Sequence, residues 1–212
     1  MTGFLFPDHL PHDGQKSREE VLTATATFHA NFLDIWQLGF HDFNTEITEH
    51  GRSRLFPITK AIDINNFAVV RAQEILSQFP EVEFCDRLGF CKWYFPGDLV
   101  MRFKKADRDH LAVGVTRDQA KAWYTNEPLP QIRNNCTRIT VWYQLDQFGT
   151  AISDIGLSYQ LSPKTLGWWS SLTEPGEMML PIAPSSLPPI PPGPNPIAIT
   201  PITPLPSEAT GG

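Results

Sequence analysis

The chain has 212 residues, of which 41% are hydrophobic and 11% aromatic, and its formal charge is −6 at pH 7. This apolar content supports a real core and excludes a chain that is disordered throughout. The acidic balance excludes general affinity of the whole molecule for nucleic acid. The chain has three cysteines and no C-x-x-C pair, which argues against a disulfide framework. It has no run of about 18 apolar residues, which argues against a membrane helix. We therefore expect a cytoplasmic protein with no membrane partner.

Residues 1–16 contain Pro, His and Gly and are predicted to be irregular. A capping box, Ser17-Arg18-Glu19-Glu20, then predicts the start of a helix. Apolar residues follow at helical spacing as far as Gly39, a candidate C-cap: Val21, Ala24, Phe28, Phe32, Ile35 and Trp36.

Residues 40–64 are rich in charged and polar side chains and predict a connector, because Pro57 breaks any helix that runs through it. A second helix is predicted from about Asn66 to Phe79, where Pro80 stops it.

Runs of alternating apolar residues after Pro80 predict a sheet. The expected strands are Val82–Leu88, Phe90–Phe95, Leu99–Lys105, Arg138–Leu145, Ala151–Leu161 and Leu166–Leu172, with a short helix from Thr116 to about Tyr124. Hairpin-length connections favour an antiparallel meander. We predict an α+β domain over residues 17–173, with five or six strands and two main helices on one face of the sheet.

The composition changes at residue 174, because 12 of the 20 prolines lie between Pro175 and Pro206. Such a segment cannot form a regular hydrogen-bond ladder, so residues 174–212 are predicted to be a disordered, polyproline-like tail. Its isolated apolar residues favour an arm that docks on a partner, and its P-x-x-P matches leave an SH3-type ligand open.

Basic residues concentrate in the middle of the chain. Residues 85–143 carry ten Lys or Arg against six acids, a local charge of +4. Strand alternation places Arg102 and Lys104 together on the face of Leu99–Lys105 that points away from the core. With them, the candidate phosphate-binding residues are Lys105, Arg108, Arg117 and Tyr143. The alternative is a charged sheet edge that resists aggregation.

Catalytic residues cannot be assigned, and two nuclease hypotheses stay open. A metal-dependent PD-(D/E)XK nuclease could draw on Glu83, Asp86 or Asp98 with Lys104, but Arg102-Phe103-Lys104 stands where E-x-K is expected. A metal-free ribonuclease could use Arg102, Lys104, His110, Arg117 and Tyr143. The histidines show no zinc spacing and no nucleotide-loop motif occurs, so we expect no metal and no cofactor.

Four motifs resemble one family. They are Leu99–Asp107 (LVMRFKKAD), Thr116–Ala120 (TRDQA), Leu129-Pro130, and Thr140–Asp146 (TVWYQLD) with Gly149-Thr150. The pattern R-F-K-K-x-D … T-x-x-Q-A … L-P … T-V-x-Y-x-L-D-x-x-G-T is similar to that of an uncharacterised family of small bacterial and phage proteins. The resemblance covers about Asn66 to Leu172. It implies a gene beside one for a zinc-peptidase-like helix-turn-helix protein, in a toxin–antitoxin or phage-defence module, and it supplies no catalytic residues.

Charge and resemblance together lead to one functional hypothesis and its rival. The first is the effector, toxin-like half of such a module, held by an antitoxin-like protein partner and contacting nucleic acid or nucleotide phosphate through the cationic sheet face. The rival is a non-catalytic protein-binding module (an inhibitor, antitoxin or phage accessory protein) that acts through the Pro-rich tail and an aromatic patch.

Overall fold

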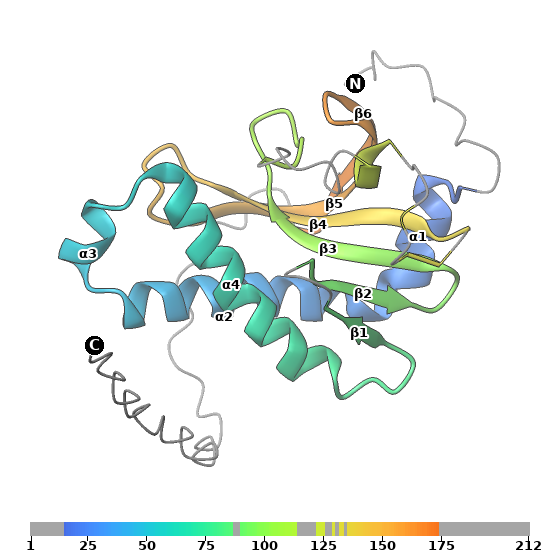
Figure 1. Cartoon of the computed structure of the whole chain (residues 1–212), viewed down its shortest axis with the longest axis horizontal. Helices are drawn as coiled ribbons and strands as arrows, with labels where there is room; N and C mark the ends of the chain where they lie inside the picture. The colour runs from blue at the N-terminus through green and yellow to red at the C-terminus, as the bar shows by residue number, and fades with distance from the viewer. Residues whose placement is uncertain are drawn as a thin grey trace, which may run out of the picture. The chain divides into compact units, whose positions relative to one another are not determined.

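Helices fill the first part of the described chain and strands the second, and the two form separate layers (Figure 1). The computed structural model describes residues 15–86, 90–113, 122–125, 129, 132–133 and 135–173. In chain order the elements are α1 (Arg18–Thr25), the 3-10 turn η1 (Ala26–Phe28), α2 (His29–Glu46), α3 (Glu49–Ser53), α4 (Pro57–Leu76), β1 (Glu83–Cys85), β2 (Lys92–Phe95), β3 (Leu99–Lys105), β4 (Thr137–Leu145), β5 (Ile152–Ser162) and β6 (Thr165–Ser171). The predicted α+β class is confirmed.

The predicted capping box begins the first helix. Ser17 Oγ accepts the backbone N–H of Glu20 at 3.3 Å, and Glu20 Oε2 accepts the backbone N–H of Ser17 at 2.7 Å. Two otherwise unbonded backbone donors are thereby satisfied. The apolar stripe behind the cap is buried at Val21, Phe28, Phe32, Ile35 and Trp36, as its spacing predicts.

Gly39 does not end this helix, because α2 continues to Glu46. A Cβ added at Gly39 would lie 2.7 Å from both Cα and the backbone nitrogen of Ala68 on α4. The prediction of a C-cap was wrong. The glycine is there because α2 and α4 pack so closely that no side chain fits between their backbones.

The predicted polar connector over residues 40–64 is also mostly helical. α3 starts after Thr48, whose Oγ1 accepts the backbone N–H of Gly51 at 3.2 Å. α4 begins at Pro57, well before the predicted Asn66. Proline is favourable at the first position of a helix, where its ring presets φ and no N–H is needed. The side chain of Arg52 donates to the carbonyls of Asn44 and Ile47 near the end of α2.

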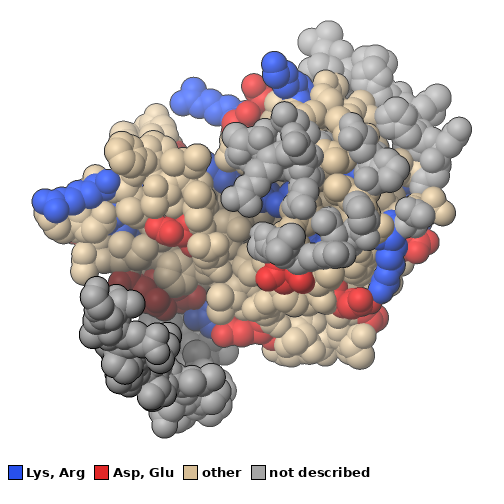
Figure 2. Space-filling view, in the orientation of Figure 1, with Lys and Arg blue, Asp and Glu red and all other residues tan. Residues whose placement is uncertain are grey.

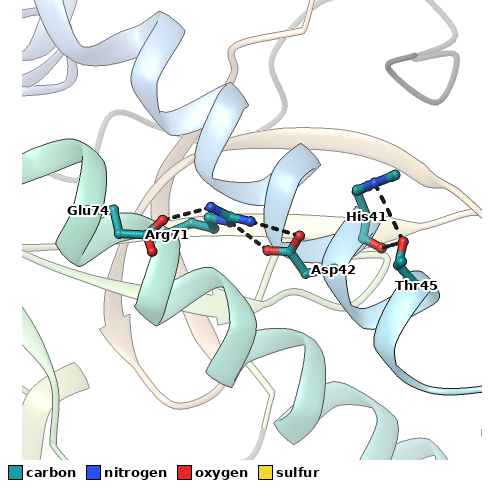
Figure 3. A network of polar contacts seen from close by, with 5 residues as sticks. All are labelled: His41, Asp42, Thr45, Arg71 and Glu74. Carbon is teal, nitrogen blue, oxygen red and sulfur yellow. Dashed lines mark hydrogen bonds and ion pairs between the residues drawn. The ribbon is translucent and has the colours of Figure 1, made fainter. Parts of the chain in front are cut away.

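An ion-paired network joins α2 to α4 (Figure 3). Arg71 on α4 donates to Asp42 on α2 twice, from Nε at 2.5 Å and from Nη2 at 3.0 Å. Its Nη1 donates to Glu74 at 2.8 Å. Hydrogen bonds to Asp42 and Glu74 raise the pKa of Arg71 above its ordinary value. This two-bonded pairing fixes the rotation of one helix against the other.

The sheet has six strands in the order β1-β2-β3-β4-β5-β6. The bounds of β3 are those predicted, and the other strands differ from prediction at their ends. Every neighbouring pair is antiparallel except β3 and β4, which run parallel from Leu99↔Thr137 to Lys105↔Tyr143. The predicted antiparallel meander was therefore wrong for the β3–β4 pair. Residues 106–136 form a connection long enough to return to the end of the sheet where β3 starts, so that β4 can run parallel to β3.

The sheet has a helix-facing side and a side that faces away from the helices, which we call the far face. On the helix side, Leu99, Met101 and Phe103 of β3 pack in one core with residues of α2 and α4. Figure 1 shows α2 and α4 on this side of the sheet. The two main helices thus cover one face, as predicted.

A second core covers the far face. Its buried members are Phe90, Tyr94, Val100, Ala112, Trp123, Tyr124, Leu129, Ile132 and Cys136. Most of them come from the connection between β3 and β4. Trp168 and Trp169 of β6 point to opposite sides, as strand alternation predicts: Trp168 packs with the helix-side core, whereas Trp169 is 37% exposed.

Four predicted segments lie outside the described residues in whole or in part: residues 1–14, the end of the strand predicted over Val82–Leu88, the helix expected to start at Thr116, and the tail over 174–212. Of that helix, residues 122–124 are described and helical. Among the described residues, none of the helices combines the length and the apolar character needed to span a bilayer.

Candidate functional site

Arg102 and Lys104 share the far face of β3, as alternation predicts, but Arg102 does not point into solvent. Only 7% of its surface is exposed, because the second core lies over it. The centre of its guanidinium lies 3.8 Å from the centroid of the Phe90 ring and 5.4 Å from that of Trp123. The expectation of an exposed cationic strand is thus wrong at its central residue.

The Arg102 guanidinium is short of polar partners. Its Nε and Nη1 are buried without a hydrogen-bond partner among the described residues. Burial lowers its pKa from the ordinary arginine value, and the nearby Tyr124 hydroxyl and Cys91 thiol oppose that shift only in part. A buried charge without a counter-ion or hydrogen bond is strongly unfavourable, so the Arg102 guanidinium is a candidate site for an anion.

Lys92 adds a second buried cation that the sequence analysis missed. β2 pairs with β3 at Trp93↔Met101 and Tyr94↔Val100, and continuing this register places Lys92 opposite Arg102. The residue is fully buried, and its Nζ has no hydrogen-bond partner within the described parts of the chain. Nζ lies 5.7 Å from the centroid of the same Phe90 ring that Arg102 covers.

Further unbonded polar atoms lie on the far face, on β4 and β5. Among the described residues, Trp142 Nε1, Ser158 Oγ and Gln160 Nε2 are buried without a hydrogen-bond partner. Arg138 differs, since its Nη1 donates to the carbonyls of Ala122 at 2.6 Å and Trp123 at 3.3 Å. Arg138 therefore joins the connection to the sheet, whereas Lys92 Nζ and the Nε and Nη1 of Arg102 have no hydrogen-bond partner among the described residues.

Comparisons of the chain with models of protein families, with curated proteins and with solved structures gave no match. The family resemblance therefore remains a prediction.

Three of the other predicted phosphate-binding residues, Lys105, Arg108 and Tyr143, do not share the surroundings of Arg102. Lys105 lies on the opposite side of β3, near Lys60 of α4, whose pKa is lowered by burial and, to a smaller extent, by the charge of Lys105. Arg108 is exposed in the turn that follows β3. Arg117 lies outside the described residues. Lys104 is half-buried and stands near Cys91.

Tyr143 is excluded from the site. It is fully buried on the helix side, where its ring centroid lies 4.4 Å from that of Trp36. Burial raises its pKa above the ordinary tyrosine value. The tyrosine belongs to the helix-side core because β4 pairs in parallel with β3, so that its odd-numbered residues face the helices together with Met101 and Phe103. The set predicted for a metal-free ribonuclease is therefore not assembled.

The carboxylates considered for a metal-dependent nuclease also stand apart. Glu83 forms an ion pair with Arg133, and Asp86 hydrogen-bonds the Cys91 thiol. Within the described ranges, no three His, Cys, Asp or Glu side chains converge in a way that could hold a metal ion. Burial and Asp86 raise the pKa of Cys91, against the opposing effect of Arg102 and Lys104, so this thiol is not an activated nucleophile.

His110 borders the far face from the loop after β3. Its ring stacks on Trp169 with a centroid distance of 3.7 Å and an interplanar angle of 9°, and meets Trp142 edge-on at 5.0 Å. Burial lowers its pKa, while Asp154, Asp107 and Asp109 oppose that shift. The stack holds the loop after β3 against β6.

Proposed function

We propose that the chain binds a phosphate-bearing ligand, either a nucleotide or the end of a nucleic-acid strand, through Lys92 and Arg102. One observation carries the proposal: two buried cations on paired strands surround one aromatic ring and have no hydrogen-bond partner among the described residues. Arginine offers a planar fork and lysine a mobile point charge, and together they suit a phosphate.

The burial of these cations favours a compact anion over a long polymer backbone. A protein that follows a nucleic-acid backbone needs an exposed basic groove. The Lys and Arg side chains that protrude in Figure 2 instead lie apart from one another on the face in view. The proposed ligand is therefore a small phosphate ester or the terminal phosphate of a strand.

In biological terms, we propose the effector half of a two-gene toxin–antitoxin or defence module. The support is the resemblance together with the local charge of +4 over residues 85–143. Binding of a nucleotide phosphate gives such an effector a target without requiring that it be an enzyme.

The test uses the full chain with inorganic phosphate, AMP, ATP and a 5′-phosphorylated oligonucleotide as ligands, followed by thermal unfolding and calorimetry. A bound ligand at a hundred times its dissociation constant stabilises the fold by about 2.7 kcal/mol. Lys92→Met and Arg102→Met should each weaken binding by at least about tenfold. The control is Lys164→Met, at an exposed turn between β5 and β6.

The same variants give an independent readout without ligand. If the cations are unpaired, methionine removes an uncompensated buried charge, and the ligand-free variants should be at least as stable as the wild type. No binding of any of the four anions, or equal binding by wild type and variants, refutes the phosphate site. Expression of the chain that leaves growth unimpaired refutes the effector role alone.

A further inference from the structure

A separate pocket lies on the helix side of the sheet, between the end of α4 and β1. It measures about 200 Å³ and is lined by Gln73, Leu76, Ser77, Val82, Phe84 and Trp93. Figure 1 shows the C-terminal end of α4 close to β1. Leu76, Val82, Phe84 and Trp93 make the lining chiefly apolar, and the volume suits one aliphatic or aromatic side chain.

Two features of this pocket are not explained by the stability of the fold. Trp93 is 1% exposed, and its indole Nε1 has no hydrogen-bond partner among the described residues. Phe84 packs against Trp93 at a centroid distance of 5.1 Å with the rings tilted by 44°, and yet it remains 38% exposed. The pocket thus lies beside an exposed apolar ring and a buried indole.

The pocket also adjoins an edge of the sheet. Among the described residues β1 pairs only with β2, so its outer backbone groups are available to another strand. An extended peptide that pairs with such an edge places every second side chain on the same face. One of those side chains would enter the pocket while the peptide backbone continues the sheet.

The charged residues near the pocket indicate which kind of peptide would bind there. Residues 73–86 contain four acids (Glu74, Glu81, Glu83 and Asp86) and no Lys or Arg. Arg71 pairs with Glu74, and Arg133 pairs with Glu83, which lies on the far face with its register partner Tyr94. Glu81 is exposed. A second copy of β1 would bring like charges together, which is unfavourable in a strand pair. The Pro-rich tail lacks basic residues altogether, since none follows Lys164.

We propose that the edge of β1 and the pocket beside it bind an extended segment of a partner protein in which an apolar residue is flanked by Lys or Arg. The apolar side chain fills the pocket against Phe84 and Trp93, and the flanking cations face the exposed acids on this side of the sheet, such as Glu81. This site is on the opposite side of the sheet from Lys92 and Arg102 and does not depend on the phosphate proposal.

The probe is a short synthetic peptide in which leucine alternates with lysine, titrated into the full chain and followed by calorimetry and by the indole N–H resonance of Trp93. Filling the pocket from the exposed position Ser77 with Ser77→Phe should weaken binding about tenfold or more. Glu81→Lys should weaken it about fivefold, and Glu49→Lys in the first turn of α3 should leave it unchanged.

Matched peptides separate the components of recognition. A version with glutamate in place of lysine, and one N-methylated to block strand pairing, should both bind at least about tenfold more weakly. Any one of four results overturns the proposal: no saturable binding, equal binding of the glutamate peptide, an unshifted Trp93 indole resonance, or binding that Ser77→Phe leaves unchanged. A concentration-dependent dimer abolished by Ser77→Phe overturns it in favour of a second copy as the occupant.

Discussion

Replacing Gly39 by alanine tests the close packing of α2 against α4. In an isolated helix this change is favourable, since alanine exceeds glycine in helix propensity by about 1 kcal/mol. In the folded chain the new Cβ would lie 2.7 Å from the Cα and the nitrogen of Ala68, and 3.1 Å from its Cβ. Two of these three atoms are backbone, so no rotamer change relieves the clash and the helices must move apart.

Overpacking of this kind costs about 1–3 kcal/mol, and separating two helices in a close-packed core brings the change to the upper part of that range. After subtraction of the gain in propensity, the free energy of unfolding of Gly39→Ala should fall by about 1–2 kcal/mol. Urea unfolding of the full chain, followed by circular dichroism, measures this as a lower midpoint at an unchanged slope.

Two controls make the result specific. Gly51→Ala, in the short helix α3, would bring its Cβ within 3.2 Å of side-chain atoms of Ile47 and Thr48, which can adjust, so its effect should be small. Ala68→Gly added to Gly39→Ala should not restore stability, because the nearest atoms belong to the backbone. A Gly39→Ala variant as stable as the wild type would show that the reasoning about this crossing is wrong.

Three further predictions concern the cap, the ion pair and the histidine stack. Ser17→Ala should lower the free energy of unfolding by about 1 kcal/mol through loss of the capping box, as measured in urea. Asp42→Asn should lower it by about 1–3 kcal/mol, since Arg71 loses a charged acceptor at a site where both side chains are mostly buried. Burial lowers the pKa of His110, so the folded state binds protons less readily than the unfolded state. Its contribution to stability is complete above the ordinary histidine pKa and is lost as the pH falls below it. His110→Asn tolerates the left-handed φ of 61° and does not titrate, so its melting temperature should fall less than that of the wild type between about pH 7 and pH 5.

Local patterns predicted the features that depend on neighbouring residues. The bounds of β3 follow from alternation after the Pro96-Gly97-Asp98 turn, and the start of α1 follows from its capping box. The same local rules failed at Gly39 and Pro57. Gly39 is required by its close contact with Ala68, which is distant in sequence. Pro57 is the first residue of α4, and proline can start a helix as well as interrupt one.

The candidate site was predicted in part. Strand alternation identified the face of β3 that Arg102 occupies. The burial of Arg102 depends on Trp123 and other residues of the β3–β4 connection, and no spacing in the sequence shows that this connection folds back over Arg102. Lys92 could have been found, since it shares its face with Tyr94 on a strand that is otherwise aromatic. Tyr143 was misplaced because its side is set by the parallel pairing of β3 and β4, which the expected meander did not contain.

The single parallel junction also bears on how the chain folds. Strands β1 to β3 and strands β4 to β6 each join their neighbours by short turns, so each trio can form from contacts close in sequence. Joining the trios requires closure of the connection over residues 106–136, and the entropy of that closure opposes the step until β3 and β4 pair. Trp123, which belongs to that connection, covers Arg102 only then, whereas Phe90 lies within the first trio. We therefore expect the proposed phosphate site to be completed late in folding, after most of the secondary structure has formed.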